Sequence, residues 1–479
     1  MVDAIGAKLT TPLATVAANS QRSPLDVLVV GGGSAGITAA RTLVEAGKRV
    51  ALLEAGPLPL LTHIQSTDLR FDPNLSRSVQ QALSYSPQGS GGSSFGSLIG
   101  CLGGRGLFWN GAAPRFSAED LEGWPISMDE LASHYAWAEE QFRVSTTYGS
   151  GRLSDAIIGR LRDGGIGAQI GPFAVDSHRT ADGWLGGTVG NSLAPLLRST
   201  MLTNQSTLLS VSTRAFVRKI LVEGGVAKGV EAVDLATGSV FPVGARSVVL
   251  AAGAFESVRL AIVSGIPNPN GLLGHYISDH IFVRAYYPIP PGLYDPDKPE
   301  VAIVWIPAEH GRNFQIEIHL PSDNLFLLQE TTSWKPDESP YYAAMVRSFA
   351  PVQPRAENFV EAVAGDTPGS YRVTLALDAD DQALAARQVN ALEVTRKAMG
   401  AEPALVQTMP MGASHHEAGG LMIGSNPAAS VADPYGRIRS VERLVVCDSA
   451  AWPGVSPANP HLTIVALARR QASQLAADL

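Results

Sequence analysis

A glycine-rich turn between an apolar run and a helical pattern constrains the fold of this chain more than any other feature of its sequence. Residues 25–30 (Leu-Asp-Val-Leu-Val-Val) are apolar enough for a buried parallel strand, and Gly31, Gly33 and Gly36 follow directly. Residues 37–47 then repeat apolar side chains at helical spacing. A strand, a G-x-G-x-x-G turn and a helix in this order are typical of a unit that binds a dinucleotide.

An acidic residue completes the unit. A second apolar strand is predicted at 49–53, and it ends at Glu54, 18 residues after Gly36. In this motif the first glycine permits the tight turn, the second lets the backbone approach the pyrophosphate, and the third allows close helix packing. The helix N-terminus attracts the phosphate charge, and the Glu54 carboxylate can accept the ribose hydroxyls.

The same turn also matches a different class of enzyme. Residues 32–36 (Gly-Gly-Ser-Ala-Gly) satisfy the G-x-S-x-G elbow of α/β-hydrolases, with Ser34 as nucleophile and His416 or His461 as base. A hydrolase needs neither the first glycine nor the acid. We therefore favour the dinucleotide interpretation, in which Ser34 contacts the cofactor.

The composition excludes several classes of protein. Charged residues make up 17% of the 479, against roughly 25% in an average soluble domain, and 45% are hydrophobic. A disordered chain has the opposite balance. The net charge of −8, without basic runs, argues against nucleic acid and anionic membranes as partners. The most apolar stretch, 247–266, contains Glu256 and Arg259, so we expect no segment that spans a bilayer.

The cysteines and histidines bear on compartment and metal content. Cys101 and Cys447 are the two cysteines of the chain, which fits a reducing compartment, and we predict a cytoplasmic protein. His275 and His280 are five residues apart without a third ligand, so we predict no metal site.

Two kinds of sheet are predicted. The chain is strand-like from 210 to 249, and alternating segments at 301–306, 314–320, 342–349 and 371–377 indicate an antiparallel sheet distinct from the parallel start. Helices are predicted at 128–142, 378–399 and 460–475, the first with a capping box of Ser127 and Glu130.

Several further motifs resemble, in the same order, those of the glucose–methanol–choline (GMC) family of FAD-dependent oxidoreductases. They are Gly103-Gly104 with Trp109-Asn110-Gly111, Gly123-Trp124-Pro125, residues 248–266, Gly274 with Asp279-His280, residues 416–420, residues 444–448, and Ala458-Asn459-Pro460-x-Leu462-Thr463. The Asn-Pro-x-Leu-Thr ending and the tryptophan are most similar to the pyranose-oxidase branch. In that branch a histidine just before the tryptophan is bonded covalently to FAD. Here that position is Phe108, so the resemblance implies dissociable FAD.

The resemblance implies an α/β fold with a discontinuous Rossmann-type FAD-binding domain and a second, substrate-binding domain on a largely antiparallel sheet. The implied segments are three parts of the FAD-binding domain (22–115, 200–280 and 405–479), a substrate or cap segment (116–199) and the substrate-binding domain (281–404). Residues 1–21 are mildly apolar without a basic start or a continuous hydrophobic run, so we predict a short disordered or draped arm there. The implied FAD contacts are Gly31, Gly33, Ser34, Gly36, Glu54, Gly104, Trp109, Asn110, Val217, Asp448 and Pro460. Val217 could equally be a core strand residue, and Asp448 an ordinary strand-end turn.

The resemblance also places a catalytic pair near the C-terminus. An imidazole titrates near neutral pH, so His416 can take the hydroxyl proton as hydride leaves, and the amide of Asn459 can hold the same oxygen. Because Pro460 disfavours a helical residue before it, Asn459 is also predicted to cap the last helix. His415 and His461 could line the pocket or simply pack.

These features predict FAD-dependent oxidation of a polar alcohol, with a sugar or glycoside hydroxyl as the substrate class. Reduced flavin would pass its electrons to oxygen or to a quinone or carrier. A lyase that keeps FAD without using its redox state, a non-enzymatic FAD-binding protein and the Ser34 hydrolase are the alternatives.

Overall fold

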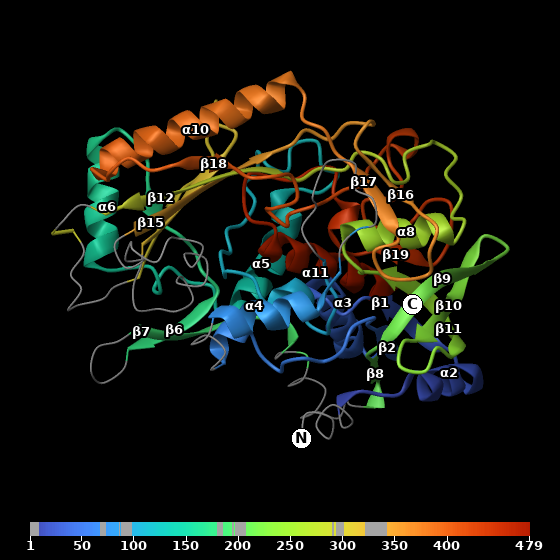
Figure 1. The fold of residues 1–479 in the computed structure, drawn as a ribbon. Coiled ribbons are helices and arrows are strands. Elements are labelled where there is room, and N and C mark those ends of the chain that lie inside the picture. Colours follow the sequence, from blue (N-terminus) through green and yellow to red (C-terminus); the bar gives the residue numbers. More distant parts are fainter. Residues whose placement is uncertain are drawn as a thin grey trace.

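The computed structural model describes residues 9–67, 73–85, 87, 98–179, 185–193, 196, 207–289, 292–293, 301–320 and 343–479. Two large sheets organise these residues, and helices pack against both (Figure 1). Most of the glycine-rich segment before Leu98 lies outside the described residues.

The first sheet has seven strands and a mixed topology. Its order is β8 (Leu209–Ser212), β2 (Val50–Leu53), β1 (Leu25–Val30), β11 (Val240–Leu250), β10 (Val226–Asp234) and β9 (Ala215–Glu223), with β19 (Leu444–Val446) paired to β11. Strands β8, β2, β1, β11 and β19 are parallel, whereas β9, β10 and β11 form an antiparallel meander. Because the strands come from three separate parts of the chain, the predicted discontinuous Rossmann-type architecture is confirmed.

Helices bury their apolar faces against this sheet and one another. Helix α3 (Ser34–Glu45) follows β1, and the C-terminal helix α11 (His461–Asp478) packs against both α3 and α5 (Met128–Phe142). Helix α5 begins at the predicted capping box, in which Ser127 Oγ accepts from Glu130 N–H and the Glu130 carboxylate accepts from Ser127 N–H. Helix α8 (Ala254–Val263) follows β11 and packs on β9.

The N-terminal segment contains a helix. Residues Leu13–Arg22 form helix α2, which packs on β11, and Leu13, Val16, Ala17 and Ser20 are buried. These positions have the spacing of one helix face. The helix contradicts disorder for these residues, whereas the alternative of an arm draped over the rest of the protein is compatible with its packing on β11.

The second sheet has six strands and is antiparallel throughout. Its order is β18 (Val406–Thr408), β12 (His280–Pro288), β15 (Ala343–Pro351), β14 (Gln315–Leu320), β13 (Ala302–Ile306) and β5 (Gln169–Ile170). Helix α10 (Ala379–Met399) packs against β12 and β15 (Figure 1). Helix α6 (Arg152–Asp163) contacts both α10 and β13. The prediction of a second, largely antiparallel sheet is therefore confirmed.

Two strands pair differently from the prediction. Strand β17 (Tyr371–Thr374) pairs with β16 (Phe359–Ala362) in a separate hairpin and not with the six-stranded sheet. Strand β18 belongs to the six-stranded sheet, although its residues were assigned to the third FAD-binding segment. Alternation identifies a strand but does not specify its partner.

The remaining described elements are short. They are α4 (Pro73–Ala82), β3 (Ser84–Tyr85), β4 (Leu98–Ile99), β6 (Val175–Arg179), β7 (Leu185–Val189) and the 3₁₀ helices η1 (Ile64–Ser66), η3 (Gly104–Leu107), η6 (Pro427–Ala429) and η7 (Ser449–Ala451). Within the described ranges, no helix combines the length and apolar character needed to cross a membrane.

Candidate active site

A cavity of about 750 Å³ is lined by residues from both large sheets. Its wall includes the turn after β1, the start of α8, the start of α11 and the facing strands β12 and β15. All the predicted cofactor contacts except Gly36, and both residues of the predicted catalytic pair, line it.

The three motif glycines have distinct steric environments. Gly31 has φ +100°, and a Cβ there would lie 2.4 Å from the backbone oxygen of Ala251. A Cβ on Gly36 would lie 1.9 Å from the backbone oxygen of Gly31, so only glycine lets the helix approach the turn. A Cβ on Gly33 would meet nothing within 4 Å, because this position opens into the cavity.

Two polar residues beside the turn, Ser34 and Glu54, line the cavity. Ser34 begins α3, and among the residues that the structure describes its buried Oγ has no hydrogen-bond partner. No histidine with a described side chain bonds this hydroxyl as a base would, which argues against the hydrolase alternative. Glu54 is buried and accepts hydrogen bonds of 2.7 Å from the N–H groups of Gly32 and Gly56. Burial raises the pKa of its carboxyl, and these two bonds partly offset the effect.

The second glycine-rich loop packs against the start of α11. The Trp109 ring stacks on His461, with centroids 3.9 Å apart, and Trp109 Nε1 donates to Gly190 O at 2.9 Å. A Cβ on Gly106 would lie 2.5 Å from Ser34 Oγ, so the close approach of loop and turn explains the glycine here. Asn110 Oδ1 accepts from Ala112 N–H at 3.0 Å.

Two further predicted cofactor contacts lie in the same wall. Asp448 is buried and accepts hydrogen bonds from Gly253 N–H (2.9 Å) and Ser257 Oγ (2.6 Å). Burial raises its pKa to about 6. Val217 lies on β9 and is also buried, so both a core role and a cofactor contact are compatible with its position.

His416 is in direct contact with a second histidine. Its Nδ1 lies 2.7 Å from Nδ1 of His280, the first residue of β12, and the other ring nitrogen of His280 lies 2.5 Å from Ser456 O. Burial lowers the pKa of His280 to about 4. Burial, followed by the neighbouring His280, also lowers the pKa of His416 well below its ordinary value. Both imidazoles are therefore neutral near pH 7.

A buried carboxylate holds the segment that carries His416. Asp279 accepts hydrogen bonds from Gly412 N–H at 3.0 Å and from Ser414 Oγ, and Ser414 Oγ in turn accepts from His416 N–H at 3.1 Å. The next residue, Glu417, is paired with Arg105 of the glycine-rich loop at 2.6 Å. The loop and the C-terminal motif are thus fixed to each other.

Asn459 does not cap α11. The helix begins after Pro460 without a side-chain cap, and Asn459 Oδ1 instead accepts a hydrogen bond of 2.7 Å from Gln315 Nε2. Gln315 lies on β14 and is itself held by Trp305 Nε1 at 2.8 Å. The predicted cap is therefore wrong: a side chain from the second sheet satisfies the Asn459 oxygen and fixes its amide at the cavity wall.

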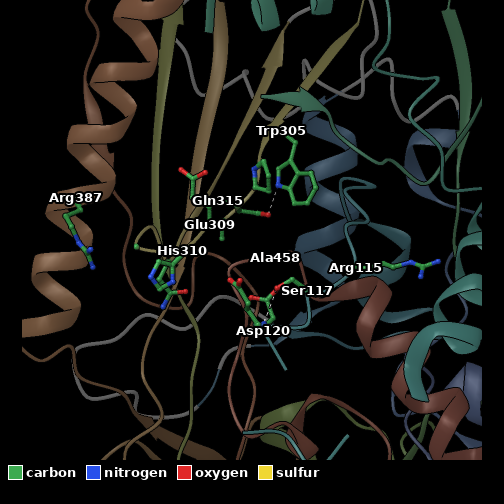
Figure 2. A pocket seen from close by; sticks show the side chains of 14 residues that line it. Arg115, Ser117, Asp120, Trp305, Glu309, His310, Gln315, Arg387 and Ala458 are labelled. Carbon is green, nitrogen blue, oxygen red and sulfur yellow. Dashed lines mark hydrogen bonds between the residues drawn. The ribbon is translucent and has the colours of Figure 1, made fainter. Parts of the chain in front are cut away.

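A smaller cavity, of about 410 Å³, lies beside this contact (Figure 2). Gln315 and Ala458 line it, and Figure 2 shows the bond from Trp305 to Gln315 at its wall. Arg387 of α10 borders it from the other direction. Gln315 and Trp305 therefore line the smaller cavity, while Asn459, which Gln315 binds, lines the larger one.

Sequence reasoning missed three of these neighbours. His280 was given as part of the Asp279-His280 motif and weighed with His275 as a metal pair, but no contact with His416 was predicted; in the structure His275 contacts Ala356 O and His280 contacts His416. Gln315 and the Arg105–Glu417 pair are joined to the site by packing of segments far apart in the chain. Only the Asp279-His280 motif carried a signal, since it belongs to the family resemblance.

A sheet with parallel central strands, a glycine turn at a helix N-terminus, a buried Ser34 hydroxyl at that terminus and a buried acid after the next strand define an FAD-binding α/β protein. The residues fit the cofactor, since Gly33 leaves room for phosphate and Ser34 Oγ has no hydrogen-bond partner in the described part of the chain. A model of FAD-binding domains matches residues 26–63, and two models of GMC oxidoreductases match residues 192–282 and 354–468. This chain belongs to the GMC oxidoreductase family.

Curated relatives are similar over most of their length. A C-glycoside 3-oxidase of Microbacterium trichothecenolyticum is 26% identical over 95% of this chain and 97% of its own length. A paromamine 6′-oxidase of Streptomyces fradiae is 25% identical, over 95% of this chain and 92% of its own length.

Solved structures share the fold at lower identity. Pyridoxine 4-oxidase from Mesorbium loti has a TM-score of 0.69 at 18% identity, covering 94% of this chain and 99% of that one. An Aspergillus oryzae RIB40 formate oxidase variant has a TM-score of 0.73 at 13% identity, covering 95% and 98%. The similarity to the pyranose-oxidase branch in particular stays a prediction.

Proposed function

We propose that this chain oxidises a hydroxyl of a sugar or glycoside to a carbonyl, with His416 as the base and Asn459 holding the reacting oxygen. When bound, FAD supplies the acceptor, flavin N5, for the hydride from the carbinol carbon. The relatives named as C-glycoside 3-oxidase and paromamine 6′-oxidase support the substrate class. The contact between His416 and His280 carries the assignment of the base.

The hydrogen bonds determine which nitrogen of His416 is free. Ser456 O can only accept, so Nε2 of His280 carries the hydrogen in their contact. Neutral His280 then has a lone pair on Nδ1, and the hydrogen between the two Nδ1 atoms belongs to His416. Nε2 of His416 is left with a lone pair. This nitrogen can take the hydroxyl proton while His280 holds the ring in place.

The cofactor is held by the residues of the cavity wall. Gly33 and Ser34 would receive the pyrophosphate at the start of α3, Glu54 the ribose, and Trp109 and Asn110 the flavin. We further propose non-covalent attachment: Phe108 lines the cavity, and the resemblance to the pyranose-oxidase branch puts the linking histidine at this position of the sequence.

We also propose that the protein is cytoplasmic and that reduced flavin passes its electrons to oxygen or to a quinone or carrier. Cys101 and Cys447 are both free and buried, which supports a reducing, cytoplasmic compartment. Comparing oxygen consumption with reduction of a quinone dye distinguishes the two classes of acceptor.

Anaerobic single-turnover reduction of the flavin by a panel of glycosides tests the function. We expect His416→Ala to slow reduction by about 10² to 10⁴, the usual contribution of a positioned base. His280→Leu should give a smaller loss, and His280→Gln should recover part of it, because an amide can accept from His416 and donate to Ser456. His275→Gln is the matched control and should behave like the wild type. Unchanged reduction in His416→Ala refutes the assigned base, and a flavin that no alcohol bleaches favours the lyase.

The pH dependence of reduction is a separate prediction. The proposed base acts when neutral, so the rate is full above its pKa and falls as the pH drops through it. Burial and His280 lower that pKa below the ordinary 6.5. We expect the rate to be flat from pH 6.5 upward and to reach half of its maximum only below that value. A half-point above pH 6.5 would contradict this.

A further inference from the structure

The face of the second sheet that lines the cavity carries an ordered series of side chains leading away from His416. Phe349 is next to His416, with ring centroids 5.3 Å apart, and it stacks on Phe282 at 4.9 Å and 12°. These two residues face each other across β12 and β15. One same-face step further, Arg284 faces Arg347 in the same register. All four side chains line the cavity.

Two arginines directly opposite each other on neighbouring strands repel, and such a pair destabilises a sheet unless counter-charges are present. Arg347 has one: its Nη2 lies 2.8 Å from the buried Glu317 carboxylate. Burial raises the pKa of Glu317, but Arg347 and His319 outweigh burial and lower it to about 2. Glu317 is therefore ionised, and it forms its ion pair with Arg347.

Arg284 is not balanced in this way. Its guanidinium lies over the Tyr286 ring, 5.7 Å from the centroid, and its buried Nε has no hydrogen-bond partner within the described ranges. Among the described residues no carboxylate forms an ion pair with it. An arginine keeps its charge in a protein, and its planar fork matches the oxygens of a carboxylate or phosphate.

We propose that the alcohol taken by this pocket carries an anionic oxygen group, a carboxylate or a phosphate, which Arg284 binds while a ring of the ligand packs on Phe282 and Phe349. The spacing supports one ligand that reaches both sites. Arg284 lies four positions after His280 on β12, or about 13 Å along the strand at the usual antiparallel rise, and the length of the arginine side chain shortens this gap. Calling this ligand the substrate rests on the proposed function; the binding of the anion does not.

Titration calorimetry of the FAD-loaded enzyme with small aromatic probes tests the proposal without turnover. The probes are benzoate and phenyl phosphate, with benzamide as the neutral counterpart. We expect at least one anion to bind about tenfold more tightly than benzamide, and the stronger of the two identifies the group. In Arg284→Gln this preference should fall to about twofold or less. Arg284→Lys keeps the charge without the fork and should retain part of it.

The matched control is Arg387→Gln, which removes the same charge from the smaller cavity and should leave the preference intact. Equal binding of all three probes to the wild type overturns the proposal, as does a preference that survives in Arg284→Gln. If Arg284→Gln does not retain FAD, the comparison of the wild type with Arg284→Lys decides. Flavin reduction by phenyl glucoside and 4-carboxyphenyl glucoside is measured in parallel. If neither reduces the flavin, the glycoside oxidation fails while the probe titrations still decide the role of Arg284.

Discussion

At the scale of single residues, the glycine turn separates what the fold needs from what the cofactor needs. A methyl group on Gly36 would collide with the backbone oxygen of Gly31 at 1.9 Å, and that oxygen belongs to the turn itself. A methyl group on Gly33 would meet no protein atom within 4 Å, and Gly33 has φ −76°, which alanine adopts freely. Packing therefore requires glycine at position 36, whereas at position 33 we propose that glycine leaves space for the phosphate of the cofactor.

This difference predicts opposite behaviour of two alanine variants. Gly36→Ala should destabilise the protein with or without FAD, by about 1–3 kcal/mol or more, as for overpacking elsewhere. Gly33→Ala should leave the Tm of the FAD-free protein unchanged but weaken FAD binding at least tenfold. Thermal unfolding of the FAD-free proteins and titration with FAD measure the two effects. Full FAD affinity in Gly33→Ala would show that the phosphate does not approach this turn.

At the scale of secondary-structure elements, local signals predicted where elements lie better than which elements pair. The capping box of Ser127 and Glu130 fixed the start of α5 correctly, because its partners are three residues apart. The alternating segment predicted at 371–377 contains strand β17 (Tyr371–Thr374), which pairs with β16 and not with the six-stranded sheet, since alternation carries no information about the partner of a strand. For the same reason the family motifs located His416 and Asn459, but not the contacts from His280 and Gln315, which β12 and β14 bring from a distant part of the chain.

Helix α10 offers a test of capping at an element that supports β12. Asp378 Oδ1 accepts from the N–H groups of Asp380 and Asp381, both at 2.9 Å. Removing these bonds leaves helix donors without partners, so Asp378→Ala should lower the free energy of unfolding by about 1 kcal/mol. Asp380→Ala is the control: Asp380 lies two residues after Asp378 in the acidic first turn, and its replacement should lower the free energy of unfolding by less. Chemical denaturation measures both, and an equal loss in the two variants would refute the cap.

At the scale of the whole molecule, the cavity is where separate parts of the chain meet. Its wall draws on the turn after β1, the glycine-rich loop, α8 and the C-terminal motif, and the Arg105–Glu417 pair joins the second of these to the last. Burial raises the pKa of Asp279, and the nearby Glu417 carboxylate adds to this effect. The negative charge in this region is therefore concentrated on Glu417, whose pKa Arg105 lowers despite burial.

A ligand that contacts all of these segments should stabilise their arrangement as a unit. If FAD is dissociable, as Phe108 implies, the Tm must rise with the concentration of free FAD. At one hundred times the Kd, bound FAD adds about 2.7 kcal/mol to the free energy of unfolding. Calorimetry of the FAD-free protein across a range of FAD concentrations measures this, and acid precipitation should release the yellow flavin into the supernatant. Gly33→Ala, which fills the phosphate position, should lose the shift at the same concentrations. Flavin retained in the acid pellet, together with a Tm that does not respond to added FAD, would mean that a residue other than the one at position 108 makes a covalent bond.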